Sequence, residues 1–381
     1  MAEKIQDSEF KARGIKKEEK DKDLVKIDSL DDFLLNESFV RNFFEAHISK
    51  MNLSNFRILK CETHLLKSKR RKPAIEFKLH LQSKTNNQQQ QQLSKSIIGK
   101  RRSDGYGEQV FNLLQELWNK GFDGRKRGGH DHDDHLKICE PIAYFPDYNL
   151  MLTSKASGLE LGKIMMTKEA IGVASGGDNK SPLETYVKQA ATWLAKLHSI
   201  HLNSGRIFSL KEEEKKFNEW GQHLSSFYPY FAKKIKDIFL PCILKAEKSI
   251  DTKLFVPIHG DFNPNNIFVD GTSITVIDFE QSCIFDPAFD LGYFIAKLIS
   301  AKRRYNLFSM DTDALQKCFL DKYAAERSTG QSLERVDLYK ARSYLQHLHF
   351  RYWTGRRKHK PESVDCEYWL NKAEECLKRW M

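Results

Sequence analysis

Apolar and polar residues alternate in the first third of the chain, with the two-residue period of a β-strand that buries one face. The clearest case is the segment 75–81, where Ile, Phe, Leu and Leu alternate with Glu, Lys and His. Apolar segments at 58–66 and 96–100 flank it, and residues 68–73 have the composition of a turn. We therefore predict a β-hairpin over 58–81 and a further strand at 96–100.

The period of the pattern changes further along the chain. Two more short strands are predicted at 141–144 and 150–153, and from Leu183 onward apolar residues recur mainly at helical spacing. Helices are expected over 110–118, 183–197, 211–250 and most of 286–381. The pattern thus predicts an α+β chain whose first part is rich in strands and whose second part is mainly helical.

Two short apolar segments interrupt the helical part. Residues 267–269 and 274–277 are joined across Asp270-Gly271, a dipeptide typical of tight β-hairpins. The sequence HGDFNPNN (259–266) precedes the first strand, and DFE (278–280) follows the second. Because the two outer ends of a hairpin lie together, we expect these two polar segments to lie side by side.

Composition divides the chain into three parts. Residues 1–27 interleave Lys, Glu and Asp and have too few apolar side chains to fold, so a disordered tail is expected there. An amino-terminal lobe is predicted over 28–154, with a glutamine-rich loop inserted at 83–95, and a helical lobe over 155–381. The predicted hairpin and its flanking segments occupy 255–290 of the second lobe.

Charge and cysteine usage narrow the class of protein. The 381 residues include 62 Lys and Arg against 51 Asp and Glu, a formal net charge of +11, which favours acidic or phosphorylated partners. No segment is apolar enough to span a bilayer or to serve as a secretion signal. The seven scattered cysteines include no Cys-x-x-Cys pair and suit reduced thiols in a cytoplasm. We expect a cytoplasmic protein that is neither secreted nor membrane-spanning.

The polar residues around the hairpin have the chemistry of phosphoryl transfer. A carboxylate at Asp261 can accept a hydroxyl proton, while an amide oxygen at Asn266 and a second carboxylate at Asp278 are the hard ligands that Mg²⁺ prefers. An acidic turn that only caps its neighbours is the simpler interpretation, and the apolar strands on both sides argue against it. We predict that the three side chains converge.

At these residues the chain resembles the aminoglycoside phosphotransferase and choline kinase family, the small-molecule branch of the protein-kinase-like superfamily. The resemblance extends forward through DPAFDL (286–291) and back through residues 150–161 and Leu197-His198, over roughly residues 96 to 300. It implies a bilobal kinase-like fold with a small β-rich lobe and a larger, mainly helical lobe. It also implies transfer of the terminal phosphate of ATP or GTP, with Mg²⁺, to a hydroxyl group of a small molecule.

The resemblance assigns a role to individual residues of the catalytic segment. Asp261 matches the catalytic aspartate, and Asn266 and Asp278 match the metal-binding residues. His259 and Asp290 match residues that support the loop. Glu280 stands where protein kinases have the glycine of Asp-Phe-Gly, a replacement usual in the small-molecule branch, which argues against a protein substrate.

In the amino-terminal lobe the resemblance points to Lys100 as the lysine that holds the nucleotide phosphates and to Glu108 as its ion-pair partner. Lys78 on the preceding strand is the alternative to Lys100. The basic segment 67–72 stands where the family has its nucleotide loop, and it is either a row of cations over the triphosphate or a solvated hairpin tip.

Other interpretations remain open. The chain could be an inactive, kinase-like nucleotide-binding regulator, because its nucleotide loop is not glycine-rich. It could also associate with nucleic acid through its basic, aromatic carboxy-terminal segment 344–358, although a packed helix is the favoured interpretation there. The segment 130–135 contains metal-ligating His and Asp side chains, but its glycine-rich flank favours a loop. The sequence indicates neither the acceptor nor the oligomeric state.

Overall fold

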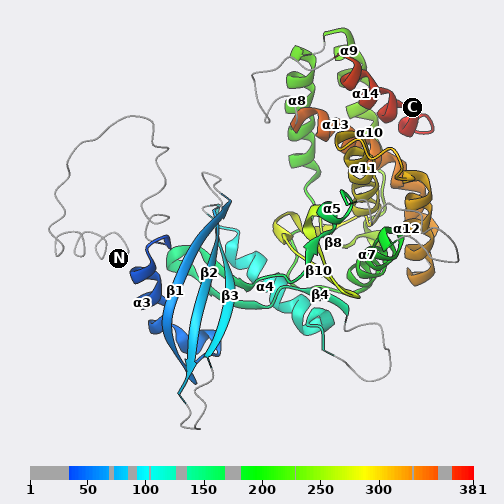
Figure 1. Cartoon of the computed structure of the whole chain (residues 1–381). Helices are drawn as coiled ribbons and strands as arrows, with labels where there is room; N and C mark the ends of the chain where they lie inside the picture. Colours follow the sequence, from blue (N-terminus) through cyan, green and yellow to red (C-terminus); the bar gives the residue numbers. More distant parts are fainter. Residues whose placement is uncertain are drawn as a thin grey trace, which may run out of the picture. The chain divides into compact units, whose positions relative to one another are not determined.

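The chain divides into two units, Met1–Gln115 with Cys139–Lys155, and Glu116–Ile138 with Ala156–Met381. The structure is a computed structural model (Figure 1). It describes residues 34–67, 73–84, 92–102, 104–125, 135–167, 182–227, 229–327, 330–350 and 363–381. The predicted tail therefore lies outside the described residues, as does most of the glutamine-rich loop.

A five-stranded antiparallel sheet forms the first unit, as the alternation of apolar and polar residues predicts. Its order is β1-β2-β3-β6-β5. The strands are β1 (Phe56–Lys67), β2 (Ala74–Ser83), β3 (Gln92–Arg101), β5 (Pro141–Phe145) and β6 (Leu150–Ser154). β3 begins four residues before the predicted strand, because Gln92 to Lys95 pair with Gln82 to Leu79 of β2. Backbone pairing thus extends the strand into a segment that has no apolar pattern.

One face of this sheet packs against helix α3 (Glu37–Ala46). The alternating apolar residues of β2 point to this face and are buried, and Phe77 contacts Phe44 of α3 with ring centroids 5.2 Å apart. β3 has Gly99 on the same face, where a Cβ atom would lie 2.5 Å from the Phe77 ring. The helix begins after Asn36, whose side chain accepts a hydrogen bond from the backbone N–H of Phe39.

The opposite face of the sheet carries α4 (Gly107–Leu117). Phe111 of α4 stacks on Tyr144 of β5, with centroids 6.1 Å apart. Tyr144 is directly opposite Met151 of β6, and Met151 is opposite Lys100 of β3. Since directly opposed residues of antiparallel strands share a face, Lys100 lies on the face that α4 covers.

The second unit contains the predicted hairpin. β9 (Ile267–Asp270) and β10 (Ser273–Val276) pair antiparallel across a turn at Gly271. They are the middle strands of a sheet with the order β4-β10-β9-β7, in which β4 (Leu136–Ile138) runs parallel to β10. β7 (Leu159–Glu160) is the other edge, and β8 (Val256–Ile258) pairs with β11 (Cys283–Phe285) in a separate ladder.

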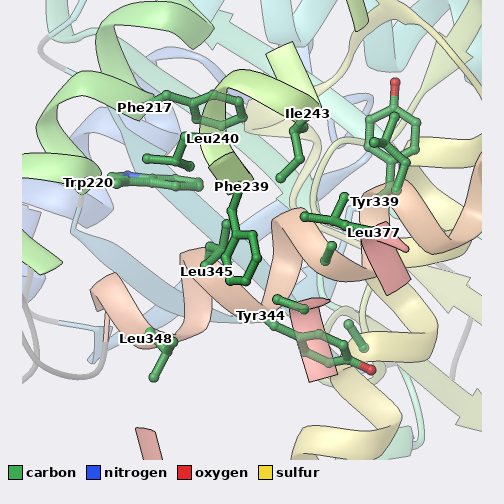
Figure 2. Packing of buried hydrophobic residues seen from close by; sticks show 14 of the residues in the cluster. Phe217, Trp220, Phe239, Leu240, Ile243, Tyr339, Tyr344, Leu345, Leu348 and Leu377 are labelled. Carbon is green, nitrogen blue, oxygen red and sulfur yellow. The ribbon is translucent and has the colours of Figure 1, made fainter. Parts of the chain in front are cut away.

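Helices make up the remainder of the second unit. They are α5 (Leu161–Ile164), α7 (Pro182–Ser199), α8 (Leu210–Phe227), α9 (Pro229–Lys234), α10 (Leu240–Lys248), α11 (Ala288–Arg304), α12 (Thr312–Arg327), α13 (Val336–His349) and α14 (Ser363–Leu377). Figure 2 shows side chains of α8, α10 and α13 in their shared hydrophobic core. The α+β fold with one β-rich and one mainly helical part is confirmed.

A buried ion pair packs against aromatic rings of this core. Arg342 of α13 is 4% exposed, and its guanidinium pairs with the fully buried carboxylate of Glu213 of α8. Removing one partner of such a pair is strongly destabilising, because it leaves a buried charge uncompensated. In the described part of the chain, no helix is both long and apolar enough to cross a membrane.

Candidate active site

The loop after β8 is held by a carboxylate on α11. Asp290 is fully buried; its Oδ2 accepts a hydrogen bond from the backbone N–H of His259 (2.6 Å), and its Oδ1 accepts one from that of Gly260 (2.9 Å). Both oxygens of one side chain are thus used to fix the backbone of the loop. Asp290 is therefore positioned to support the backbone of the loop, a role that needs no contact with substrate.

His198 supports Asp290 in turn. Its Nε2 lies 3.3 Å from Oδ2 of Asp290, and its Nδ1 lies 2.8 Å from the hydroxyl of Tyr323. A carboxylate can only accept, so Nε2 donates the hydrogen bond, and Nδ1 accepts the one from Tyr323. Burial lowers the pKa of His198, although hydrogen bonding to Asp290 opposes that effect. We infer a neutral imidazole that holds Asp290 in place.

His259 connects the loop to the hairpin. Its Nε2 donates to the backbone carbonyl of Ile277 (3.0 Å), and its Nδ1 accepts from the backbone N–H of Asp261 (3.2 Å). The imidazole is fully buried among aromatic rings, which are those of Trp193, Phe262 and Phe279. These contacts fix the position of Asp261 relative to the residue that precedes Asp278.

The carboxylate of Asp261 accepts hydrogen bonds from three side chains. Its Oδ1 accepts from the hydroxyl of Tyr293 (2.7 Å) and from Nδ2 of Asn263 (3.1 Å), and its Oδ2 accepts from Nδ2 of Asn266 (3.1 Å). Burial, followed by the nearby negative charge of Asp261, raises the pKa of Tyr293 well above its usual value, so its hydroxyl stays protonated and donates. Donors to both oxygens therefore fix the orientation of the carboxylate. Because Oδ2 accepts one of these hydrogen bonds and Oδ1 accepts two, Oδ2 can more readily accept a further hydrogen bond.

Asn266 and Asp278 are brought together by the hairpin backbone. The carbonyl of Asn266 accepts a hydrogen bond from the N–H of Ile277 (2.9 Å), and Asp278 is the next residue. Asp278 has φ 74° and ψ 56°, the left-handed region, which costs a non-glycine residue about 1–3 kcal/mol and is enriched at functional sites. Since Nδ2 of Asn266 is used by Asp261, its amide oxygen is the atom available to a cation.

Gly260 allows the loop to approach the segment that carries Glu280. This segment is the 3-10 turn Phe279–Gln281, directly after Asp278. Gly260 has φ +77°, and a Cβ atom there would lie 2.3 Å from the carbonyl oxygen of Gln281. Only glycine permits this backbone contact without strain.

In the first unit, Lys100 and its alternative Lys78 lie on the same face of the sheet. Lys100 is opposite Ala74, and Lys78 is opposite Ser96, two positions of one β2–β3 ladder separated by an even number of residues. Burial raises the pKa of the Cys139 thiol to about 11, an effect that the nearby charge of Lys100 opposes. Glu108 is exposed in the first turn of α4. Its pairing with Lys100 stays a prediction.

A sequence profile of the phosphotransferase enzyme family matches residues 137–327. The chain belongs to this family. The matched part includes the loop after β8, the hairpin and Asp290, whereas Lys100 and Glu108 precede it. No curated protein matches the chain in sequence.

Solved structures show that the fold of this family member is shared with small-molecule kinases. A candidate aminoglycoside phosphotransferase from Ralstonia eutropha is 12% identical (TM-score 0.56; 90% of this chain and 97% of that chain are covered). Choline kinase from Cryptosporidium parvum is 14% identical (TM-score 0.52; 90% and 94%). Choline kinase LicA from Streptococcus pneumoniae is 17% identical (TM-score 0.50; 90% and 99%). At these identities the likeness concerns the fold alone.

Sequence reasoning missed two of the groups around Asp261. Asn263 is part of the polar loop, but nothing in its spacing distinguished it from Asn265. Tyr293 follows Asp290 by three residues on α11, so both side chains lie on neighbouring positions of one helix face. That spacing was the signal that could have placed Tyr293 beside the loop.

A further pair, Glu76 and Lys155, lies on the α4 face of the first unit. Nζ of Lys155 contacts both carboxylate oxygens of Glu76, at 2.9 and 3.0 Å. Residues 68–72 of the expected nucleotide loop and residues 130–134 of the His and Asp segment lie outside the described residues. Among the residues that are described, no group of three or more His, Cys, Asp and Glu side chains could hold a metal ion.

Proposed function

We propose that this member of the phosphotransferase family is a kinase that transfers the terminal phosphate of ATP or GTP to a hydroxyl group of a small molecule. The observation that carries the proposal is the Asp261 carboxylate, which three donors hold in one orientation. Family membership supports phosphoryl transfer, and the choline kinases among the proteins of similar fold support a small-molecule acceptor.

Asp261 is the proposed catalytic base. The acceptor hydroxyl would donate to Oδ2, the oxygen that accepts from Asn266 alone among the described residues. During transfer, the hydroxyl oxygen forms a bond to the terminal phosphorus, and its proton passes to Asp261. The bond from that phosphorus to the bridging oxygen breaks, and the nucleoside diphosphate leaves with the electron pair.

Asn266 and Asp278 are the proposed ligands of Mg²⁺. One amide oxygen and one carboxylate fit this ion, which usually takes one or two carboxylates and completes its octahedral shell with phosphate oxygens and water. The absence of a three-residue acidic or histidine cluster among the described side chains is compatible with such a site. When bound, the metal ion neutralises negative charge on the phosphates.

Lys100 is the proposed phosphate-binding lysine, with Lys78 as the alternative and Glu108 as the proposed partner of Lys100. The supporting observation is that both lysines lie on one face of the sheet in the first unit. We propose a cytoplasmic reaction whose partners are the nucleotide and the acceptor, with neither membrane nor nucleic acid involved. The seven free cysteines agree with a reducing compartment.

The test is release of ADP from Mg-ATP in the presence of a panel of hydroxylated metabolites. Asp261→Ala should lower the acceptor-dependent rate by roughly 10²- to 10⁴-fold. Asp270→Asn is the matched control, because Asp270 is an exposed residue of the same hairpin, and its rate should equal that of the wild type. A near-normal rate for Asp261→Ala would refute the assigned role. Nucleotide binding without transfer to any acceptor would instead support the inactive regulator.

A further inference from the structure

Three side chains spaced one turn apart form a row along α11. Phe289 and Tyr293 stack with ring centroids 6.4 Å apart and an interplanar angle of 14°. Nζ of Lys297 lies 4.7 Å from the centroid of the Tyr293 ring. The spacing of four residues places all three on the same helix face.

Tyr293 connects this row to the proposed catalytic base through its hydrogen bond to Oδ1 of Asp261. The ammonium group of Lys297 is consequently near the carboxylate. Burial lowers the pKa of Lys297, and the charge of Asp261 partly offsets that effect. A half-buried cation therefore lies beside the group that is to receive the acceptor hydroxyl.

Two cations contact the aromatic rings of this row, Lys297 at Tyr293 and Arg342 of α13 at Phe289, and they differ in their counterions. The guanidinium of Arg342 lies 4.7 Å from the Phe289 centroid, and Glu213 neutralises it. For Lys297, the described part of the chain contains no hydrogen bond or ion pair. Lys297 is only partly buried, so part of its surface remains open to water or a ligand. Partial burial of this cation is costly, the charge of Asp261 offsets only part of that cost, and an anionic ligand would offset more of it.

We propose that Lys297 binds an anionic group of the phosphate acceptor, so that the acceptor is a hydroxylated carboxylate or phosphate ester. This inference rests on the proposed function, because it needs the acceptor hydroxyl at Asp261. It also names a substrate class opposite in charge to choline. Tyr293 would form the wall between the acceptor's anionic group and its reacting hydroxyl.

The experiment compares four small hydroxylated probes by isothermal titration calorimetry in the presence of Mg-ADP. These are glycerate, glycerol 3-phosphate, glycerol and choline. The wild type should bind at least one of the two anions about 10-fold or more tightly than glycerol or choline, as a charge-assisted contact predicts. The preferred anion distinguishes the carboxylate from the phosphate ester.

Substitutions at Lys297 test the assignment. Lys297→Met and Lys297→Gln should abolish the preference for anions, and Lys297→Arg should retain it. A thermal unfolding transition for each variant serves as the check that it is folded. Lys297→Met and Lys297→Gln are two independent tests of the charge at position 297. No measurable binding of either anion to the wild type, equal binding of all four probes, or an unchanged preference in the folded neutral variants would overturn the inference.

The failure of this inference and that of the proposed function are distinguishable. Selective binding of an anion without phosphate transfer to any acceptor would refute the proposed function and support the anion site at Lys297. Efficient phosphorylation of choline that Lys297→Met does not affect would support the kinase activity and refute the anion site.

Discussion

The backbone N–H of His259 and the carboxylate of Asp290 are joined by a hydrogen bond of 2.6 Å, although 31 residues separate them in sequence. This bond and its neighbour at Gly260 fix the start of the polar loop to the first turn of α11. The loop geometry thus depends on a helix that contributes its own contact, Tyr293, to Asp261.

We expect Asp290→Ala to destabilise the protein. It removes the acceptor of two backbone N–H groups in a buried setting, at about 1–3 kcal/mol for each unsatisfied group. The free energy of unfolding from urea titration should fall by about 2–5 kcal/mol. Asp270→Ala, at an exposed position, should change it by less than about 0.5 kcal/mol. Equal effects of the two substitutions would contradict the support role of Asp290.

Tyr293→Phe should impair turnover more than stability. It removes one hydrogen bond to the Asp261 carboxylate and keeps the ring that stacks on Phe289. We expect kcat to fall about 10-fold with little change in the KM for nucleotide, since hydrogen bonds to charged groups contribute about 1.5–3 kcal/mol.

The control for this prediction is Tyr305→Phe, at an exposed tyrosine that caps the same helix. Its kcat should equal that of the wild type. A loss of stability in Tyr293→Phe with unchanged kcat would indicate a purely structural tyrosine.

Gly260→Ala and Gly271→Ala form a matched pair. Both glycines have positive φ, but a Cβ atom at Gly260 would meet the Gln281 carbonyl, whereas the space around Gly271 is open. Gly271→Ala should therefore lower the free energy of unfolding by only about 1–2 kcal/mol, the penalty for an alanine in the left-handed backbone conformation. Gly260→Ala should cost more and should also lower kcat, because the loop that carries Asp261 has to move. Thermal unfolding and steady-state kinetics of the pair measure the difference, and equal melting temperatures would argue against a steric requirement at Gly260.

Acidification should destabilise the protein through His349. Its Nε2 lies 2.8 Å from Nδ1 of His223, and burial, followed by the charge of His223, lowers the pKa of His349 to about 4. In the unfolded chain the pKa of His349 is near 6.5, so the unfolded chain binds a proton at His349 more tightly than the folded chain does. The contribution of His349 to stability is therefore complete above pH 6.5 and decreases as the pH falls toward 4.

Melting temperatures between pH 7 and 5 test this expectation. The wild type should lose more stability over that interval than His349→Gln does. His201→Gln, at an exposed histidine, should follow the wild type. The same pH dependence in all three proteins would exclude His349 as the responsible group.

Local patterns predicted those parts of the fold that neighbouring residues determine. The alternation in β2 gave the buried face of the first sheet, and Asp270-Gly271 gave the central hairpin. The order of polar residues around that hairpin predicted that Asp261, Asn266 and Asp278 converge. The structure contains the contact between Asp261 and Asn266, and the convergence of Asp278 with them stays a prediction. Each of these features involves residues close in sequence.

Features that depend on distant residues could not be predicted. Arg342 pairs with Glu213 across 129 residues, and Lys155 with Glu76 across 79. No sequence spacing identifies either pair, because the packing of whole helices and strands brings the partners together. The same holds for the start of β3 in a polar segment, where backbone pairing with β2 replaces a hydrophobic pattern.

The short strand β4 makes the second unit discontinuous in sequence. Residues 136–138 supply the parallel neighbour of β10, although residues 139–155 belong to the other unit. A polypeptide that starts at residue 156 would leave one side of β10 without a backbone partner, and such open edges invite intermolecular association. Recombinant expression of the helical part alone should therefore yield aggregates unless the segment 116–138 is reattached by a linker.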